Sequence, residues 1–314
     1  MAKVAFVFPG QGSQTVGMGR DWHEQTELGR AIFDRADAVL GFPLGRVCFA
    51  GPDDELKKTH HAQPGLFVCS VIVFDYLKRA GIAPAVVAGH SLGEYSALYA
   101  AGVFDLETGL SLVRARGLAM GEAAEARPGA MAAVLGLDAA RIEAVCGEIR
   151  AGGGIVQAAN FNSPGQTVIS GERAAVEAAT EALKSAGARR VIPLPVHGAF
   201  HSPLMESAVA KMETALAAAS LTNPKVPFLA NAEGDFLEEA DAIRASLARQ
   251  ITHCVRWSEI MGKIAGLAVE SVIEVGPGRV LNGLWRQSGS AIAARSCGTV
   301  EEAKALVAES EKQR

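Results

Sequence analysis

Short apolar runs, separated by longer segments with helical periodicity, place the strongest constraint on the fold of this 314-residue chain. The runs are too short for buried helices and are bounded by glycine or proline, which favours buried strands of a parallel sheet. Four runs fit this description: Val4–Phe8, Ala85–Ala88, Val226–Ala230 and Val269–Val275. Because ligands of open α/β sheets bind beyond the carboxyl ends of the strands, we expect functional residues to follow these runs.

The middle of the chain has a different order of predicted elements. From residue 131 onward the pattern predicts strand, helix, strand, strand, helix and strand, with apolar residues on one face of each helix. This βαββαβ order is typical of a ferredoxin-like domain. We therefore predict an α/β protein with a large parallel-sheet domain, residues 1–127 and 198–314, and an inserted small domain, residues 128–197.

The composition argues against several classes of protein. Apolar residues make up 49% of the chain and charged residues 20%, which supports a large core and excludes a disordered chain. The formal net charge is −4, so the chain has no basic excess for nonspecific nucleic-acid binding. The five cysteines are odd in number and contain no CxxC pair, which argues against a disulfide framework and a thiolate metal site.

The apolar segments are also too short to cross a membrane. The longest, Leu66–Phe74, is far shorter than the roughly 20 residues that a spanning helix needs. The run Val4–Phe8 is shorter than the core of a signal peptide. We therefore expect a cytoplasmic protein with no membrane partner.

The sharpest local signal is the segment Gly89-His90-Ser91-Leu92-Gly93, which lies between a predicted strand and a predicted helix. In this setting Gly-x-Ser-x-Gly forms a tight turn that exposes the serine hydroxyl at the edge of an α/β-hydrolase-like sheet. The N-terminus of the following helix offers free N–H groups to developing negative charge. We predict that Ser91 is a nucleophile; the alternative is a glycine-rich turn with an incidental serine.

A serine nucleophile needs a general base. Of the seven histidines, three remain as candidates: His197, His201 and His253. His90 is too close to the serine in the chain, and the others lie in polar surroundings that favour a surface position. The sequence favours His201 about as strongly as the other two candidates together.

The usual third member of a hydrolase triad is missing. No aspartate occurs between Asp138 and Asp235, so the order Ser, Asp, His of α/β-hydrolases is poorly matched. A backbone carbonyl can orient the histidine instead. This absence argues against an ordinary esterase.

Two further regions are candidates for the site. The loop from Phe8 to Gln14 lacks the spacing of a phosphate-binding or dinucleotide-binding motif, but its backbone could donate an N–H to an oxyanion. Arg114 and Arg116 flank the apolar face of a helix predicted over Leu106–Glu122. One guanidinium could bind a substrate carboxylate through two parallel hydrogen bonds, and the periodicity does not choose between them.

Taken together, these segments resemble the malonyl-CoA:acyl carrier protein transacylase family over nearly the whole chain, from Phe8 to about Leu284. The landmarks are Phe8-Pro9-Gly10-Gln11-Gly12-Ser13-Gln14, Gly89-His90-Ser91-Leu92-Gly93-Glu94, Arg116-Gly117-x-x-Met120, Asn160-Phe161-Asn162-Ser163-Pro164-Gly165-Gln166, Gly198-Ala199-Phe200-His201-Ser202-Pro203, Val255-Arg256-Trp257 and Glu274-Val275-Gly276-Pro277-Gly278. Each segment is weak alone, but their order and spacing make coincidence very improbable.

The resemblance implies a role for each matching residue. It implies Ser91 as nucleophile, His201 as general base and acid, and the main-chain carbonyl of Gln250 as the group that orients His201. It further implies an oxyanion hole from the N–H groups of Gln11 and Leu92, and Arg116, rather than Arg114, on the malonyl carboxylate. Substrate contacts are implied for Phe200, Asn160 and Asn162, and the bulk of Phe200 leaves little room for an α-methyl branch.

The implied activity is a ping-pong transfer of malonyl from malonyl-CoA to the pantetheine thiol of acyl carrier protein, for fatty acid synthesis. The resemblance implies no metal and no cofactor. We expect a monomer, with an acidic carrier protein steered by basic residues. Candidates are Arg189 and Arg190, or Lys57 and Lys58. The alternative is a serine esterase or thioesterase that uses the same Ser-His pair with water as acceptor.

Overall fold

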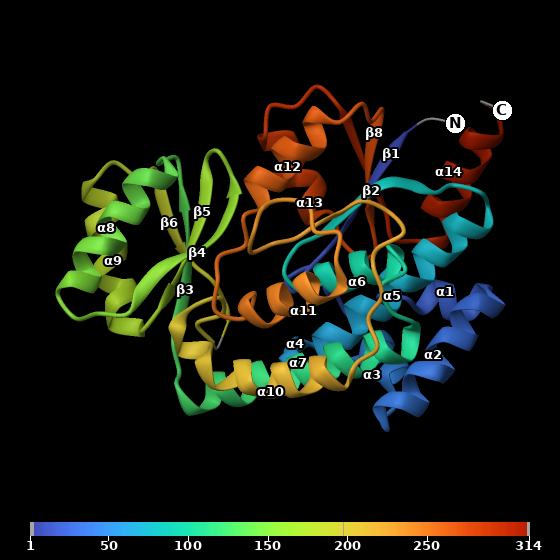
Figure 1. Cartoon of the computed structure of the whole chain (residues 1–314), viewed down its shortest axis with the longest axis horizontal. Helices are drawn as coiled ribbons and strands as arrows, with labels where there is room; N and C mark the ends of the chain where they lie inside the picture. The colour runs from blue at the N-terminus through green and yellow to red at the C-terminus, as the bar shows by residue number, and fades with distance from the viewer. Residues whose placement is uncertain (1–2, 197, 313–314) are drawn as a thin grey trace.

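A five-stranded, fully parallel sheet lies at the centre of the larger part of the molecule (Figure 1). The computed structural model describes residues 3–196 and 198–312. The strands are β1 (Val4–Phe8), β2 (Pro84–Gly89), β7 (Phe228–Leu229), β8 (Ser271–Val275) and β9 (Ala293–Cys297), in the spatial order β7-β2-β1-β8-β9. The carboxyl ends of these strands therefore meet at one edge, as the sequence predicts.

Helices cover both faces of this sheet. Because successive side chains of a strand point to opposite faces, Phe6 and Phe8 of β1 enter one core and Ala5 and Val7 enter the other. The core around Phe6 and Phe8 is completed by α1 (Arg20–Gln25), α2 (Glu27–Leu40), α3 (Leu44–Ala50), α4 (Asp53–Lys57), α5 (Thr59–Arg79), α6 (Gly93–Ala100), α7 (Leu106–Ala126), the 3₁₀ turn Pro203–Met205, α10 (Glu206–Ala218), α11 (Ala240–Arg249) and α14 (Val300–Lys312). The opposite core is completed by α12 (Trp257–Gly266) and α13 (Val280–Gln287).

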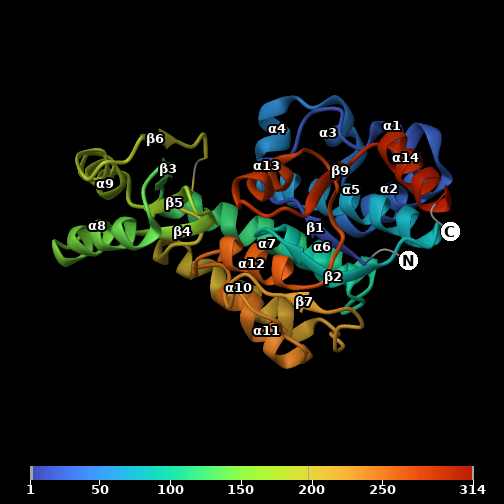
Figure 2. The same cartoon turned by 90° about the horizontal axis from the view of Figure 1, so that it is seen from above.

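A four-stranded antiparallel sheet forms the smaller part, at one end of the molecule (Figure 2). Its elements are β3 (Ala130–Leu135), α8 (Ala139–Ala151), β4 (Val156–Ser163), β5 (Gln166–Gly171), α9 (Arg173–Ser185) and β6 (Arg190–Pro193). The spatial order β4-β5-β3-β6 is that of a ferredoxin-like fold, with α8 and α9 packed on one face. The other face carries Met131, Ala133, Ala159 and Val168 and packs against Phe200.

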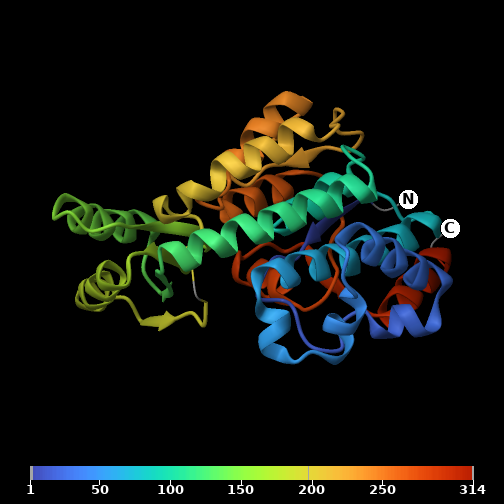
Figure 3. The same ribbon diagram turned by 90° about the horizontal axis from the view of Figure 1, so that it is seen from below.

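The long helix α7 runs from the larger part of the molecule to the smaller part (Figure 3). Arg116 is one of its buried residues. The residue before α7, Asp105, caps the helix: its side chain accepts a hydrogen bond from Thr108 N at 2.9 Å. The fold is thus the predicted α/β architecture: a parallel, hydrolase-like sheet with a ferredoxin-like insertion.

Three strands differ from the sequence expectations. The runs at residues 226–230 and 190–196 form shorter strands, since Pro227, Pro193 and Pro195 lack the N–H that a sheet ladder uses. The edge strand β9 was not expected, because its largely exposed sequence, Ala-Ala-Arg-Ser-Cys, has no apolar run. Within the described ranges, no helix is both long and apolar enough to span a bilayer.

Candidate active site

Ser91 lies in the turn between β2 and α6, at the carboxyl edge of the parallel sheet. Its φ is 51°, a left-handed conformation that residues other than glycine rarely adopt. Asn231, which follows β7, holds this turn. Its Oδ1 accepts a hydrogen bond from Ser91 N at 2.7 Å, and its Nδ2 donates to Gly89 O at 2.7 Å. The strained turn is therefore supported from a neighbouring strand.

The loop after β1 packs directly against this turn. A Cβ at Gly93 would lie 2.0 Å from Phe8 O, so only glycine allows the close approach of the two backbones. The contact brings Gln11 and Leu92 into the same region. Neither of their backbone N–H groups has a hydrogen-bond partner within the described part of the chain. Both are therefore free to donate to a substrate oxygen.

The side chain of His201 faces Ser91. Its Nε2 lies 2.8 Å from Ser91 Oγ, and its Nδ1 lies 2.8 Å from Gln250 O. A carbonyl only accepts hydrogen bonds, so Nδ1 carries the proton and Nε2 is left to accept from the serine hydroxyl. His201 also has a left-handed φ, 57°. Of the other candidate bases, His253 is exposed and contacts Arg249 O, and His197 lies outside the described residues.

Burial keeps His201 neutral. Removal of the ring from water, and then the positive charge of Arg116, lower its pKa to about 3, although the hydrogen bond to Gln250 O opposes this shift. The imidazole is therefore an unprotonated base at neutral pH. Burial and the Arg116 charge also raise the free energy of the protonated ring. A negative charge bound to Arg116 would reduce this penalty.

Arg116 is the arginine that reaches the serine. Its side chain is buried, and its Nη2 donates to Ser91 Oγ at 3.1 Å and to Gln250 Oε1 at 2.7 Å. The guanidinium also lies over the ring of Tyr95, 5.7 Å from the ring centre. Arg116 Nε is buried without a hydrogen-bond partner among the described residues. The guanidinium therefore has an unused N–H that could donate to a carboxylate. Arg114 instead lies over the ring of Phe42 and is partly exposed.

Gln250 joins these groups into one network. Its side-chain Nε2 donates to Ser91 O at 2.9 Å and to Glu94 Oε2, while its Oε1 accepts from Arg116. Glu94 Oε1 accepts in turn from Asn231 N at 3.1 Å. Burial raises the pKa of Glu94 to about 8, although these two donors and Arg116 favour its ionised form.

Sequence reasoning missed Asn231, and it assigned no role to Glu94. A signal for each was present: Asn231 directly follows the apolar run at residues 226–230, where site residues are expected. Glu94 ends the motif that begins at Gly89, and its carboxylate would be uncompensated in a core without the donors described above.

The antiparallel sheet contributes from β4. Asn160 and Asn162 are both buried, and Asn162 Oδ1 lies 2.9 Å from His90 Nε2. Asn162 Nδ2 donates to Gln166 Oε1 at 3.0 Å, so a ligand would have to exchange with these partners. Phe200 is half-buried between the core of the parallel sheet and the open face of the antiparallel sheet.

The described residues include no group of three or more His, Cys, Asp or Glu side chains placed to hold a metal ion. The geometry is that of a serine nucleophile, a neutral histidine base, two free N–H groups and a buried arginine. This combination suits acyl transfer to and from a serine hydroxyl.

Comparison with known proteins identifies the family. The acyl transferase domain model matches residues 5–307. The chain is 44% identical over 287 residues to the malonyl CoA-acyl carrier protein transacylase of Bacillus subtilis, covering 91% of this chain and 90% of the relative. It is 45% identical over 288 residues to the enzyme of the same name from Escherichia coli, covering 91% and 93%. This chain belongs to the malonyl CoA-acyl carrier protein transacylase family.

Solved structures of the family agree. A malonyl-transacylase in complex with a type II PKS acyl-carrier protein superimposes with a TM-score of 0.94 at 40% identity, over 98% of this chain and 100% of that chain. The transacylase of Coxiella burnetii also has a TM-score of 0.94, at 36% identity, over 98% and 97%. The parallel sheet with its ferredoxin-like insertion is therefore the architecture of this acyltransferase family.

Proposed function

We propose that the protein transfers a malonyl group from malonyl-CoA to the phosphopantetheine thiol of acyl carrier protein through a malonyl ester on Ser91, and so supplies fatty acid synthesis. One observation carries the proposal: the guanidinium of Arg116 lies 3.1 Å from the hydroxyl that would receive the acyl group. A buried cation at this position selects an acyl group that ends in a carboxylate. The names of the relatives, and the carrier bound to one of them, support the same substrates.

In the first half-reaction, His201 Nε2 takes the proton of Ser91 Oγ as the oxygen attacks the thioester carbonyl. The N–H groups of Gln11 and Leu92 donate hydrogen bonds to the carbonyl oxygen as it becomes negatively charged. The tetrahedral intermediate then collapses, the C–S bond breaks, and His201 returns the proton to the coenzyme A sulfur. Malonyl-Ser91 remains.

The second half-reaction reverses these steps. His201 takes the proton of the carrier thiol, the sulfur attacks the ester carbonyl, and the proton returns to Ser91 Oγ as the C–O bond breaks. Gln250 O holds the imidazole in the required tautomer throughout, in the place of the missing aspartate.

Arg116 affects the base as well as the substrate. Its positive charge is the second cause, after burial, of the lowered pKa of His201. A malonyl carboxylate on Arg116 neutralises that charge, which raises the pKa of His201 and makes proton uptake from Ser91 easier. An acetyl group leaves the charge in place. Malonyl would therefore be favoured in the chemical step as well as in binding.

The proposal also covers the organisation of the protein. Residues 1–127 and 198–314 would form the catalytic domain and residues 128–197 the small domain, in a cytoplasmic monomer. The enzyme would have no nucleic-acid or membrane partner. Light scattering on the purified protein tests the monomer, and limited proteolysis near residues 127 and 198 tests the boundaries.

Intact-protein mass spectrometry after mixing with malonyl-CoA tests the function. We expect the mass of one malonyl group on the wild type and none on Ser91→Ala. Subsequent addition of carrier protein should remove the group and add it to the carrier. Release of free malonate in place of transfer would indicate the hydrolase alternative, and absence of the acyl-enzyme would refute the serine mechanism.

A further inference from the structure

Helix α13 is in contact, near both of its ends, with segments that carry predicted site residues. Just before it, Gly278 contacts Ser13, which belongs to the loop that contains Gln11. At its last residue, Gln287 Oε1 accepts a hydrogen bond from Ser163 Oγ at 3.2 Å, one residue after Asn162 in β4. The helix therefore runs from the loop after β1 to β4 of the small sheet.

The exposed side of α13 is cationic with an apolar residue in it. Arg279 and Arg286 are exposed, and Val280 between them is 48% exposed, one of only three large apolar side chains exposed among the described residues. Arg286 has no ion-pair partner within the described ranges. Arg279 pairs with Glu302 at 2.9 Å, but its side chain is 77% exposed, so this pair is weak and easily exchanged.

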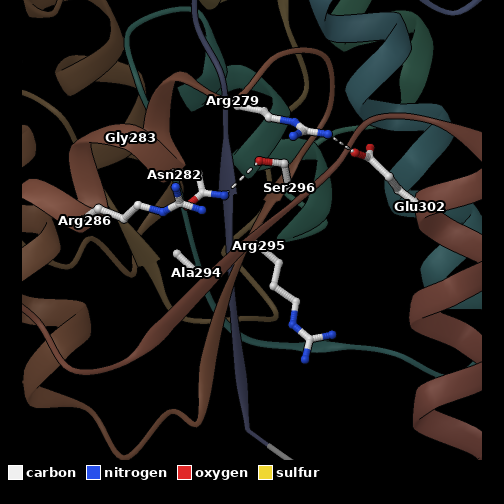
Figure 4. Close-up of a pocket in the computed structure, with 8 residues that line it drawn as sticks. All are labelled: Arg279, Asn282, Gly283, Arg286, Ala294, Arg295, Ser296 and Glu302. Carbon is white, nitrogen blue, oxygen red and sulfur yellow. Dashed lines mark hydrogen bonds and ion pairs between the residues drawn. The ribbon is translucent and has the colours of Figure 1, made fainter.

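A cavity of about 370 Å³ opens beside these residues (Figure 4). Its lining includes three arginines and one carboxylate: Arg279, Arg286, Arg295 and Glu302. In Figure 4 the Arg279 side chain points to Glu302, and Asn282 and Ser296 lie beside the arginines. The side-chain Oδ1 of Asn282 is buried and has no hydrogen-bond partner in the described structure. Arg295 forms an exposed ion pair with Glu309, as Arg279 does with Glu302, and both pairs are weak because their side chains are solvated. The charge of Arg286 is therefore the one that no carboxylate balances among the described residues around the cavity, and it leaves this part of the surface with a positive excess although the chain as a whole has a net charge of −4.

The other basic candidates from the sequence differ from Arg286, which has no ion-pair partner among the described residues. Lys57 and Lys58 each form an ion pair within their own segment, with Asp53 and Glu55 respectively. Arg190 belongs to β6, which is separated from β4 by two strands of the small sheet.

We propose that the α13 surface, defined by Arg279, Val280, Arg286 and Arg295, is the docking site for an acidic face of the acyl carrier protein. The inference rests on the proposed function, because a carrier whose thiol must reach Ser91 has to bind next to it. A surface of arginines around an exposed valine fits a partner that presents carboxylates around an apolar residue. The cavity beside it accommodates one carboxylate side chain of that partner.

The test separates the two half-reactions of the enzyme. In the double variant Arg279→Glu/Arg286→Glu we expect the KM for carrier protein to rise about ten-fold or more. Loading of Ser91 from malonyl-CoA, and transfer of malonyl to free pantetheine, an uncharged thiol acceptor, should keep their wild-type rates. The matched control is Arg141→Glu on α8, an exposed arginine in the helix layer of the small sheet, which should change none of these values.

Three results would overturn the docking site. An unchanged KM for carrier protein in the double variant would show that the carrier does not dock on the α13 surface. An increase in the KM for malonyl-CoA alone assigns the arginines to the phosphates of coenzyme A. An equal loss with carrier, malonyl-CoA and pantetheine indicates a change in the shape of the enzyme.

A second measurement needs no variant. The wild-type KM for carrier should rise as NaCl increases from about 50 to 200 mM, while transfer to pantetheine stays constant. Failure of the wild type to form malonyl-Ser91 would be a different result, because it would refute the proposed function itself.

Discussion

Among the described residues, the side chains that hydrogen-bond to Ser91 lie outside the antiparallel sheet: Asn231 follows β7, Arg116 is in α7, Gln250 follows α11, and His201 precedes the 3₁₀ turn. The antiparallel sheet reaches the site differently. Gln157 of β4 donates from Nε2 to His201 O at 2.8 Å and to Thr252 O at 3.0 Å, and the open sheet face packs against Phe200. In the proposed mechanism the reacting groups thus lie outside the antiparallel sheet, which supports the backbone of His201 through Gln157 and packs against Phe200.

The difference follows from topology. In a parallel sheet every strand ends at the same edge, so loops that are distant in the sequence converge there. An antiparallel sheet built from adjacent elements brings its strand ends to both edges and presents a face instead. We therefore expect substitutions of the residues that meet at the edge of the parallel sheet to reduce the rate of acyl transfer strongly. Substitutions in the antiparallel sheet should have smaller effects.

The largest effect is expected for His201→Ala. Without the base, the rate of Ser91 acylation by malonyl-CoA should fall by about 10⁴-fold, as measured by quenched-flow mass spectrometry. His253→Ala serves as control and should retain the wild-type rate, because the His253 side chain is exposed and bonds only to Thr252 and Arg249. Retained acylation in His201→Ala would assign the base elsewhere.

Arg116→Ala should affect malonyl far more than acetyl. Loss of a charge-assisted, two-point contact predicts a decrease of about 100-fold in kcat/KM for malonyl-CoA. For acetyl-CoA, kcat/KM should not fall, because loss of the charge also raises the pKa of His201. Arg114→Ala is the control, since its guanidinium lies on Phe42. Equal losses for the two acyl groups would contradict the carboxylate contact.

Asn231→Leu tests the support under the nucleophile. The Ser91 N–H and Gly89 O would lose their partners, which should lower kcat about ten-fold with little change in KM. The free energy of unfolding should also fall by about 2 kcal/mol. Asn223→Ala removes the Asn223 Oδ1 acceptor from Ala240 N at the start of α11 and should lower stability without the kcat effect. If both variants lose kcat equally, Asn231 has no special part in positioning Ser91.

Gln157→Ala tests the support from the antiparallel sheet. Loss of the hydrogen bonds to His201 O and Thr252 O should lower kcat only a few-fold, because His201 keeps its ring contacts. A loss as large as that of His201→Ala would break the distinction between the two sheets.

The smallest expected effect is on the pH dependence of kcat/KM for malonyl-CoA. Because burial and Arg116 lower the pKa of His201 to about 3, the wild-type kcat/KM for malonyl-CoA should stay constant as pH falls from 7 to well below 6.5. Removal of the positive charge raises the pKa of the histidine, so the acid limb of Arg116→Ala should move to higher pH. An acid limb at the same pH in both proteins would contradict the coupling of Arg116 to His201.

The lowered pKa of His201 also makes the free energy of unfolding depend on pH. The folded pKa of His201 lies below its unfolded value of about 6.5, so the unfolded chain binds a proton first as pH falls. Stability from the neutral, buried ring is present above pH 6.5 and is lost as pH falls toward 3. Urea titrations across this range should show less of this loss in His201→Gln.

The sequence by itself determined the features that depend on local spacing. Gly-x-Ser-x-Gly between a strand and a helix places Ser91 at the sheet edge, and the βαββαβ order specifies the ferredoxin-like insertion. Periodicity left Arg114 and Arg116 equivalent, because both flank the apolar face of α7. It also left three histidines as candidates, and the family resemblance pointed to His201.

Tertiary structure decided which of these residues meet Ser91. His201, Gln250 and Asn231 lie 110, 159 and 140 residues from it along the chain, and they bond to it or to its peptide groups. No local pattern encodes such contacts, since they arise where separate strands end at one edge and where α7 turns Arg116 toward that edge. The low pKa of His201 has the same origin, because burial and a nearby guanidinium exist only after the two sheets and their helices have packed.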